Sequence, residues 1–444
     1  MARRTMKSVE ITEDQPTTEG NVMEVNRYDL QVALHELQRV AVTTGAVNPV
    51  TSFVHLSNDK HGGLRLAAND LEVGIVARLK GSTLALNQDA ILSAKVFSKL
   101  VKGAKKTSKE VVKIEVQKWS RTSGPRYVVG KDSVGLTVDG MTTKLTPDNT
   151  PDNFPDPEAS VGGKIDDVEV VDIVSLRRSL EYVIPAASND ATRYNLNGVL
   201  LDFEDHKMVT TDGHRLHMGL LDVRTPDLEL FKKDMHQVLV PKLFAEQVAR
   251  VLKHVDDTVP AMFSLHKMDD TDYHLLRFDV VGKIGWTIMC RVIDSQFPEY
   301  KNVVPTKKHC LNMFEIKRDT LVKVCKRMIV VYGNDGQPGG TFALKDDNKL
   351  DVMVSRPENE ASTTVDVLTL RKHEGTVKIE VDDAGHEIEV KKYHRDVRAN
   401  FQYVLQAVNE KVHDEVVVYF GEDLDPLLFD NGEGFEGVVM PLRK

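Results

Sequence analysis

Residues 30–41 read LQVALHELQRVA, and this stretch decides the fold because its pattern returns twice along the chain. Leu30, Leu34 and Leu37 recur at intervals of four and three residues, which predicts an apolar stripe on a helix of about four turns. Equivalent leucines begin predicted helices at Leu176 and Leu321. The spacings are 176 − 30 = 146 and 321 − 176 = 145 residues, so we interpret the chain as three copies of one domain of ordinary size.

Two further sets of residues repeat with a similar period. Phe97, Phe244 and Tyr403 lie on the second predicted helix of each copy and are 147 and 159 residues apart. The Phe-Pro pairs at 154–155 and 297–298 are 143 residues apart and each closes a copy. Two helices and many short strands in each copy predict an α+β fold with helices on one side of a sheet. Large copies joined end to end form an arc or a ring.

The predicted organisation follows from composition and periodicity. Residues 1–22 are polar without periodicity and predict a disordered extension, whereas residues 151–167 are rich in proline and glycine and predict a linker. The copies then cover 23–150, 168–305 and 306–444. The predicted helices include 89–103, 318–329 and 399–412, and the predicted strands include 64–68, 73–79, 127–129 and 134–138.

Composition limits the class of protein. The chain has 444 residues with 58 basic and 67 acidic side chains, a net charge of −9, which argues against a nucleic-acid binder that is basic over its whole surface. Three cysteines are too few for a disulfide framework or a structural zinc site. The sequence contains neither an apolar run of membrane-spanning length nor the apolar centre of a signal peptide, so we expect a cytoplasmic protein.

Basic side chains gather on the predicted helices. Lys95, Lys99, Lys102 and Lys106 follow one another at steps of four, three and four, which places them on one face of a helix. The other copies contribute Arg177, Arg178, Lys242, Arg250, Lys253, Lys323, Lys326 and Arg327. A solvated face without a partner is one interpretation. Basic helices repeated in an acidic protein favour another, in which they line a surface that contacts nucleic-acid phosphates without reading sequence.

Simple geometry tests whether such helices could surround DNA. Helices packed side by side lie ~9 Å apart, so a circle of six leaves a bore of only ~7 Å. Duplex DNA is roughly 20 Å across and would not pass. Twelve helices leave ~25 Å, and eighteen leave ~42 Å, which is too wide for lysines to reach the backbone. Two copies of the chain fit best, which predicts a head-to-tail homodimer.

Four short motifs carry a resemblance to a known family. Copy two contains RYNLNGVLL at 193–201, TDGHRL at 211–216 and FPEY at 297–300, and the chain ends with VVMPLR at 438–443. In this order and spacing they closely resemble the bacterial sliding clamp, the beta subunit of DNA polymerase III, over residues 23–444. The resemblance implies the DNA clamp fold in a ring-shaped dimer, with helices lining the hole and sheets outside. Such a ring encircles double-stranded DNA and acts as a processivity factor in DNA replication, loaded by a separate ATP-driven clamp loader.

The resemblance also implies a pocket between copies two and three that receives a short hydrophobic peptide from a DNA polymerase or clamp loader. Carried over by motif, its residues are Leu196, Thr211, His214, Arg215, Leu216, Pro298, Val303, Pro426, Val438, Met440, Pro441 and Leu442. Tyr194 is added to the basic residues above as a residue expected to face DNA. Where the family often has a second arginine after its Phe-Pro run, this chain has Lys301 and Asn302, and its third copy is longer than usual.

An enzyme is the alternative hypothesis. Asp212 and His214 could form the acid/base pair of a hydrolase, whereas the simpler interpretation is a tight turn that presents His214 and Arg215 at a surface. The sequence contains no nucleophile elbow, no metal-binding spacing and no complete phosphate loop. We therefore predict no catalysis, no metal and no cofactor.

Overall fold

The computed structural model describes residues 22–41, 49–80, 85–107, 109–117, 133–146, 150–159, 161–190, 192–224, 236–268, 273–333, 338–356, 360–372, 376–381, 387–392, 395–409, 413–422 and 424–443. The chain divides into two compact units. The first contains residues 1–159 with 283–285, and the second contains 160–282 with 286–444.

The first unit contains copy one. Its elements are β1 (Met23–Asn26), α1 (Arg27–Val40), η1 (Pro49–Ser52), β2 (Phe53–Asn58), β3 (Leu64–Asn69), β4 (Val73–Leu79), β5 (Ala90–Ser93), α2 (Ala94–Val101), β6 (Val111–Gln117), β7 (Ser133–Val138), β8 (Met141–Leu145) and η2 (Pro151–Asn153). They form one sheet of order β1-β6-β7-β8 and a second set of strands of order β4-β3-β2-β5.

The second unit begins with copy two, of which residues 283–285 are assigned to the first unit. Its elements are β9 (Val161–Val170), α3 (Ile173–Val183), η3 (Ile184–Ala186), β10 (Gly198–Asp202), β11 (Lys207–Thr211), β12 (Arg215–Leu220), β13 (Val223–Arg224), β14 (Gln237–Pro241), α5 (Lys242–Val251), η4 (Leu252–His254), β15 (Ala261–Met268), β16 (His274–Val281), β17 (Ile284–Arg291) and η5 (Tyr300–Asn302).

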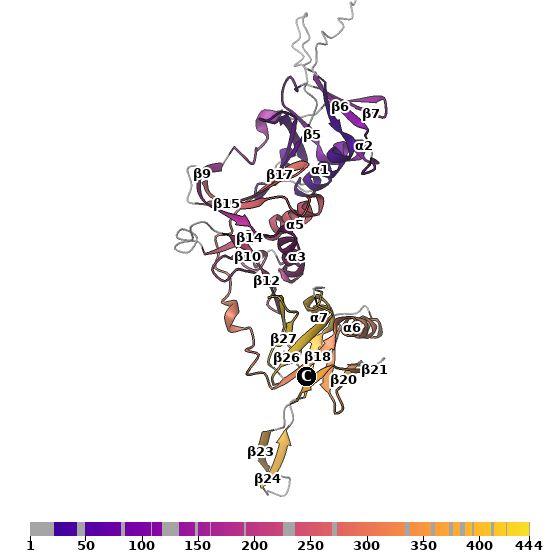
Figure 1. The fold of residues 1–444 in the computed structure, drawn as a ribbon, viewed down its shortest axis with the longest axis vertical. Helices are drawn as coiled ribbons and strands as arrows, with labels where there is room; N and C mark the ends of the chain where they lie inside the picture. Colours follow the sequence, from indigo (N-terminus) through magenta and orange to yellow (C-terminus); the bar gives the residue numbers. More distant parts are fainter. Residues whose placement is uncertain are drawn as a thin grey trace, which may run out of the picture. The chain divides into compact units, whose positions relative to one another are not determined.

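Copy three completes the second unit. Its elements are β18 (Asn312–Lys317), α6 (Arg318–Tyr332), β19 (Gly339–Leu344), β20 (Lys349–Ser355), β21 (Glu360–Asp366), β22 (Thr369–Arg371), β23 (Thr376–Val381), β24 (Glu387–Lys392), β25 (Asp396–Asn400), α7 (Phe401–Ala407), β26 (Glu415–Phe420), β27 (Leu427–Asp430) and β28 (Glu436–Val439). Strands β23 and β24 form a separate two-stranded sheet (Figure 1).

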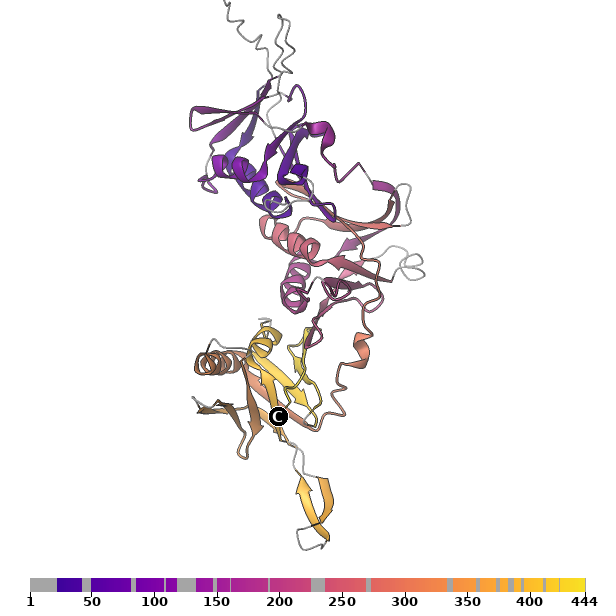
Figure 2. The ribbon, with the colours of Figure 1, turned by 180° about the vertical axis from the view of Figure 1, so that it is seen from behind.

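The strand order repeats from copy to copy. The order β1-β6-β7-β8 of copy one returns as β9-β15-β16-β17 and as β18-β26-β27-β28, and β4-β3-β2-β5 returns as β12-β11-β10-β14 and as β21-β20-β19-β25. In each copy two helices contact each other, α1 with α2, α3 with α5 and α6 with α7, the last two pairs being visible from both sides in Figures 1 and 2. The mixed α+β class predicted from the sequence is confirmed.

The repeated first helix owes its position to its apolar stripe and its first turn. Leu30, Leu34 and Leu37 are fully buried against β3 and β4, and the Asn26 side chain caps α1 by accepting a hydrogen bond from Asp29 N. Arg27 begins α1 and donates to the Val101 and Lys102 carbonyls, while its backbone N donates to Glu110 O at 2.9 Å. Arg318 begins α6 in the same way, with its N donating to Asp414 O at 2.8 Å.

Two predicted helices are shorter than their sequence pattern indicated. α2 covers Ala94–Val101 rather than 89–103 because residues 90–93 pair with β2 as strand β5. Gly103 follows at φ +110°, a left-handed conformation typical of a helix end. α7 covers Phe401–Ala407 rather than 399–412 because residues 396–400 pair with β19 as β25. Residues 410–412 lie outside the described part of the chain.

The predicted strands 64–68, 73–79 and 134–138 are confirmed as β3, β4 and β7, whereas 127–129 and most of the predicted extension, residues 1–21, lie outside the described residues. At the end of the predicted linker, residues 161–167 belong to β9, which pairs with β15. The boundaries of the three copies stay predictions. No helix in the described ranges is both long and apolar enough to cross a membrane.

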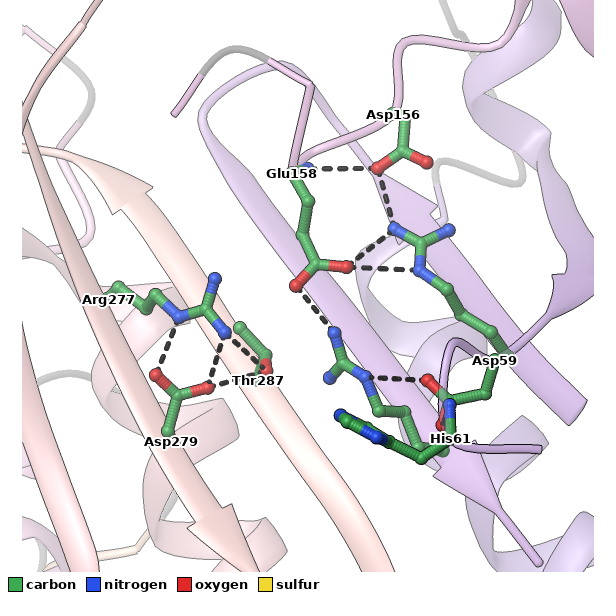
Figure 3. Close-up of polar contacts among 9 residues, drawn as sticks. Asp59, His61, Asp156, Glu158, Arg277, Asp279 and Thr287 are labelled. Atoms are coloured by element: carbon green, nitrogen blue, oxygen red, sulfur yellow. Dashed lines mark hydrogen bonds and ion pairs between the residues drawn. The ribbon is translucent and has the colours of Figure 1, made fainter. Parts of the chain in front are cut away.

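The residues after the first Phe-Pro pair are fixed by ion pairs (Figure 3). Arg65 of β3 binds Asp156 at 2.7 Å and Glu158 at 2.9 Å, and Arg78 of β4 binds Glu158 through its Nη2. Burial alone would raise the pKa of Asp156, but its hydrogen bond to Arg65 and the charge of that guanidinium outweigh burial and hold the pKa below the ordinary 3.8. These ion pairs therefore hold the end of copy one against strands β3 and β4.

The ion pair between Arg65 and Asp156 predicts a loss of stability in acid. A carboxylate whose pKa is depressed by folding stabilises the fold above its ordinary pKa, and this contribution is lost as the pH falls through the folded value. We expect Asp156→Asn to lower the free energy of unfolding by about 1–2 kcal/mol at pH 7. The deficit should shrink as the pH falls below the ordinary pKa of 3.8. Urea titrations from pH 7 to pH 3 measure it, with the exposed Asp152→Asn as control; a deficit independent of pH would contradict the account.

Candidate functional site

Copies two and three are joined by paired strands. β12 runs antiparallel to β28, with Arg215 opposite Val439 and Leu216 opposite Val438. Beyond the strand, Met440 N donates to His214 O at 2.9 Å. The TDGHRL segment of copy two and the VVMPLR segment of copy three, more than 200 residues apart in sequence, are therefore immediate neighbours.

The TDGHRL segment forms a tight turn whose polar groups satisfy one another. Thr211 Oγ1 donates to Arg215 O at 2.7 Å, and Asp212 Oδ1 accepts from His214 N at 2.9 Å and from Arg215 N at 3.1 Å. Gly213 at φ +88° supplies the left-handed residue that the turn requires. The turn exposes the His214 side chain, and the Asp212 carboxylate is bound to the backbone and to Arg215. The hydrolase hypothesis has no support from the described residues.

Arg215 links the two copies from a buried position. Its side chain is 10% exposed; Nε contacts Asp212 Oδ2 at 3.0 Å and Nη2 donates to Pro185 O at 2.6 Å. The guanidinium also lies over the Tyr403 ring of α7, with Cζ 4.4 Å from the ring centroid. The carboxylate partner offsets the cost of burying the cation, so Arg215 is a structural link across the junction.

An apolar cluster lies beneath these segments. Leu216 and Val438 pack with Phe297 and Tyr300 of the FPEY segment, and the cluster is completed by Leu200, Val209, Met218, Leu239 and Leu428. Exposed apolar side chains flank it: Val303 is 46% exposed and Met440 is 37% exposed. A buried apolar base with a few exposed apolar and polar groups is the composition expected of a peptide-binding surface.

The structure can be compared with the twelve residues predicted for the peptide pocket. Its contacts bring together Thr211, His214, Arg215, Leu216, Val438 and Met440, and Pro298 and Val303 lie on the segment held by Phe297 and Tyr300. Leu442 instead packs against other residues of copy three. Its N donates to Arg398 O at 2.8 Å, and its Cδ1 is so close to Gly339 that a Cβ on that residue would lie only 2.3 Å from it. Leu196 is buried next to the strand β10, and Pro426 and Pro441 are half-buried. Their part in a pocket stays a prediction.

Three residues of the site are not predicted from the sequence: Tyr300, Asp202 and Tyr403. Tyr300 lies in the quoted FPEY motif, and its hydroxyl is 2.9 Å from Asp205 Oδ2 and 3.2 Å from Asp202 Oδ2. Its position in the FPEY motif is the signal by which Tyr300 could be identified as a site residue. Tyr403 is one of the repeated aromatic residues of the second helices, and no local pattern indicates that it would contact Arg215.

The predicted lysine face of copy one is only partly helical. Lys95 and Lys99 lie on α2, but the helix ends at Val101, so Lys102 and Lys106 follow it in turns. All four lysines are exposed. The buried residues of α2 are Ala94, Phe97 and Val101, whereas Val96 is 43% exposed.

The basic residues of copies two and three differ in how strongly they are engaged. Arg178 binds Glu433 at 3.1 Å and lies over the Phe435 ring, and Lys253 binds Glu181 at 2.6 Å. Arg177 donates to Leu252 O at 3.4 Å and Lys242 to Asn189 at 2.6 Å, while Arg250 lies half-buried on α5. On α6 the side chains of Lys323, Lys326 and Arg327 are exposed, as is that of Tyr194. Arg178 is thus better described as a junction residue.

Comparisons with known proteins agree on one family. Residues 171–299 match the family model described as "DNA polymerase III beta subunit, central domain". The beta sliding clamp of Pseudomonas aeruginosa is 33% identical over 132 residues, which cover 29% of this chain and 32% of that protein. The beta sliding clamp of Pseudomonas putida is 25% identical over 272 residues, covering 60% and 63%. The chain thus spans between about a third and just under two thirds of the length of these curated relatives.

Solved structures extend the likeness to the whole fold. The DNA polymerase III subunit beta from Pseudomonas aeruginosa has a TM-score of 0.70 at 21% identity, covering 95% of this chain and 100% of that one. The sliding clamp from Bartonella birtlesii, solved bound to griselimycin, has a TM-score of 0.72 at 17% identity, covering 96% and 100%. The resemblance to the bacterial sliding clamp predicted from the four motifs is confirmed, and the fold of this chain is the sliding-clamp fold.

Proposed function

We propose that this chain is a DNA sliding clamp: two copies form a ring around double-stranded DNA and hold a replicative polymerase and other partners on it. The ring performs no catalysis. It acts in the cytoplasm, where bacterial DNA is replicated, and a separate loader opens and closes it. The contacts with DNA are electrostatic and independent of sequence, because lysine and arginine neutralise backbone phosphates that every sequence shares.

One observation carries the proposal: the junction of β12 and β28 brings the two motifs expected to form a partner site into register in the second unit. The junction therefore places the motifs of two different copies side by side. The buried cluster of Leu216 and Val438 provides a base for an apolar peptide side chain, and the exposed His214 and Met440 provide the edge.

The helices support the DNA-facing part of the proposal. Each copy pairs two helices, so two chains would contribute the twelve that the bore estimate requires. The cations of α2 and α6, Lys95, Lys99, Lys323, Lys326 and Arg327, are exposed. They are available to phosphate in a protein whose net charge is −9.

Peptide binding tests the partner site. We expect His214→Ala to weaken binding of a short peptide carrying leucine and phenylalanine anchors by about five- to tenfold, because one polar contact at the rim of a site contributes roughly 1 kcal/mol. Fluorescence anisotropy with a labelled peptide measures the affinity of the full-length protein. The exposed His309→Ala is the matched control.

The mass of the protein under native conditions serves as the second readout in that experiment. His214→Ala should leave the dimer intact, since His214 is exposed on a turn and the change removes only its side chain. Failure of the unaltered protein to bind any such peptide would overturn the proposed partner site.

A further inference from the structure

The FPEY segment reaches the proposed peptide site without belonging to a sheet. After β17, Ile293 N donates to Leu239 O at 2.8 Å, and the chain then makes local backbone bonds, such as Asn302 N to Glu299 O at 3.2 Å and Val303 N to Tyr300 O at 3.1 Å. Local bonds fix the shape of a turn but not its place on the molecule. Side chains must therefore hold this segment against copy two.

Two aromatic rings supply part of that hold. Phe297 and Tyr300 are both buried in the cluster that contains Leu216 and Val438. Apolar packing has little directional preference, so rings alone leave a segment free to slide or tilt within the cluster. A directional contact is needed to fix its register.

The Tyr300 hydroxyl makes such a contact. It lies 2.9 Å from Asp205 Oδ2 and 3.2 Å from Asp202 Oδ2, so one phenolic proton is shared between two carboxylates. Asp202 is only 1% exposed, and its other contacts are Gln237 Nε2 at 2.8 Å and Asp205 N at 2.9 Å. The acceptors are thereby fixed to β10, β14 and the turn that joins β10 to β11.

The charges around this hydroxyl keep it protonated. Burial, followed by the hydrogen bond to Asp205 and the charges of Asp202 and Asp205, raises the pKa of Tyr300 far above its ordinary value. Lys301 binds Asp205 and partly offsets the two negative charges. The hydroxyl thus remains a donor over the whole working pH range.

We propose that Tyr300, through the hydrogen bond of its hydroxyl to Asp205 and Asp202, positions the Pro298–Val303 wall and so sets how tightly the site holds its peptide. The inference rests on the proposed function. Pro298 lies two residues before Tyr300, and Val303 ends the η5 turn by donating its N–H to Tyr300 O. Fixing the ring in place therefore fixes both exposed side chains. Tyr300 itself is buried and is a positioning residue.

The first test removes only the hydroxyl. Tyr300→Phe keeps the ring in the cluster, and we expect it to weaken the labelled peptide about five- to tenfold in anisotropy measurements on the full-length protein, with the dimer mass unchanged. Tyr419→Phe is the matched control, because Tyr419 packs partly buried against the same cluster from β26. It should bind the peptide as the unaltered protein does.

Changes at the acceptor separate positioning from stability. Asp205→Asn keeps an oxygen that can accept from Tyr300 and should retain most of the affinity, whereas Asp205→Ala should lose several-fold. Combining Asp205→Ala with Tyr300→Phe should cost little more than Tyr300→Phe alone, because both remove one contact.

The outcomes distinguish this inference from the proposed function. If the unaltered protein binds no peptide, and His214→Ala and Tyr300→Phe change nothing, the proposed function fails. If the unaltered protein binds, His214→Ala weakens binding, and Tyr300→Phe binds as tightly as Tyr419→Phe, the positioning role alone is overturned. If Tyr300→Phe melts below the assay temperature, the acceptor variants decide: equal affinities for Asp205→Asn and Asp205→Ala would overturn it.

Discussion

Arg215→Ala is expected to lower the free energy of unfolding of the second unit by about 3 kcal/mol, the loss typical of a buried ion pair deprived of one partner. The change removes the partner of Asp212, a hydrogen bond to Pro185 O and the cation over the Tyr403 ring. Asp212 would remain as a largely buried carboxylate without its counter-charge. Thermal unfolding followed by circular dichroism, together with urea titration, measures the effect.

A paired substitution isolates the electrostatic part of this effect. Arg215→Met combined with Asp212→Asn removes both charges while keeping side-chain volume and an acceptor for the turn, so it should be clearly more stable than Arg215→Ala. Arg215→Lys keeps the charge but loses the planar fork and should lie between the two. An Arg215→Ala protein as stable as the unaltered one would mean that the junction does not depend on this link.

The second large effect concerns a histidine buried in the same junction. His217 is fully buried, its Nδ1 lies 2.8 Å from Tyr182 O, and its ring stacks on Tyr182 at 4.8 Å between centroids. Burial lowers its pKa to about 4, with the hydrogen bond to Tyr182 opposing that shift and Arg215 adding to it. The ring is therefore neutral in the folded protein throughout the physiological range.

A lowered histidine pKa makes the fold less stable in mild acid. Below the ordinary pKa of 6.5 the unfolded chain binds a proton that the folded chain does not accept until about pH 4, so stability falls across this window. The difference of about 2.5 pH units corresponds to roughly 3 kcal/mol. We expect His217→Gln, which retains a donor for Tyr182 O, to lose most of this dependence between pH 7 and pH 4. Equal pH slopes for the two proteins would contradict the assignment.

The repeated architecture could be predicted because each copy carries its own strong local signals. The Leu30 stripe, its counterparts at Leu176 and Leu321, and strands such as Val73–Leu79 depend on periodicity that any core-facing element must show. The shortened helices could not be predicted in the same way. The segment 90–93 has a pattern compatible with helix, and only its pairing with β2 makes it a strand.

The candidate site was predictable as a set of motifs but not as a set of contacts. The resemblance implies Arg215 as a pocket wall, whereas its guanidinium contacts Asp212, Pro185 and the distant Tyr403. Arg178 was assigned to DNA from its place on a helix, yet Glu433 and Phe435 of copy three engage it. Arg215 and Tyr403 are 188 positions apart, and Arg178 and Glu433 are 255 apart, so local patterns carry no information about these two pairings.

Retention on circular DNA tests the central claim most directly. The protein is loaded with ATP and a bacterial clamp loader onto a nicked circular plasmid, and the DNA-bound fraction is measured by gel filtration before and after one restriction cut elsewhere in the plasmid. A ring that encircles DNA is predicted to remain bound to the circle through high-salt washing and to slide off the linear form. Equal retention on circular and linear DNA would contradict it.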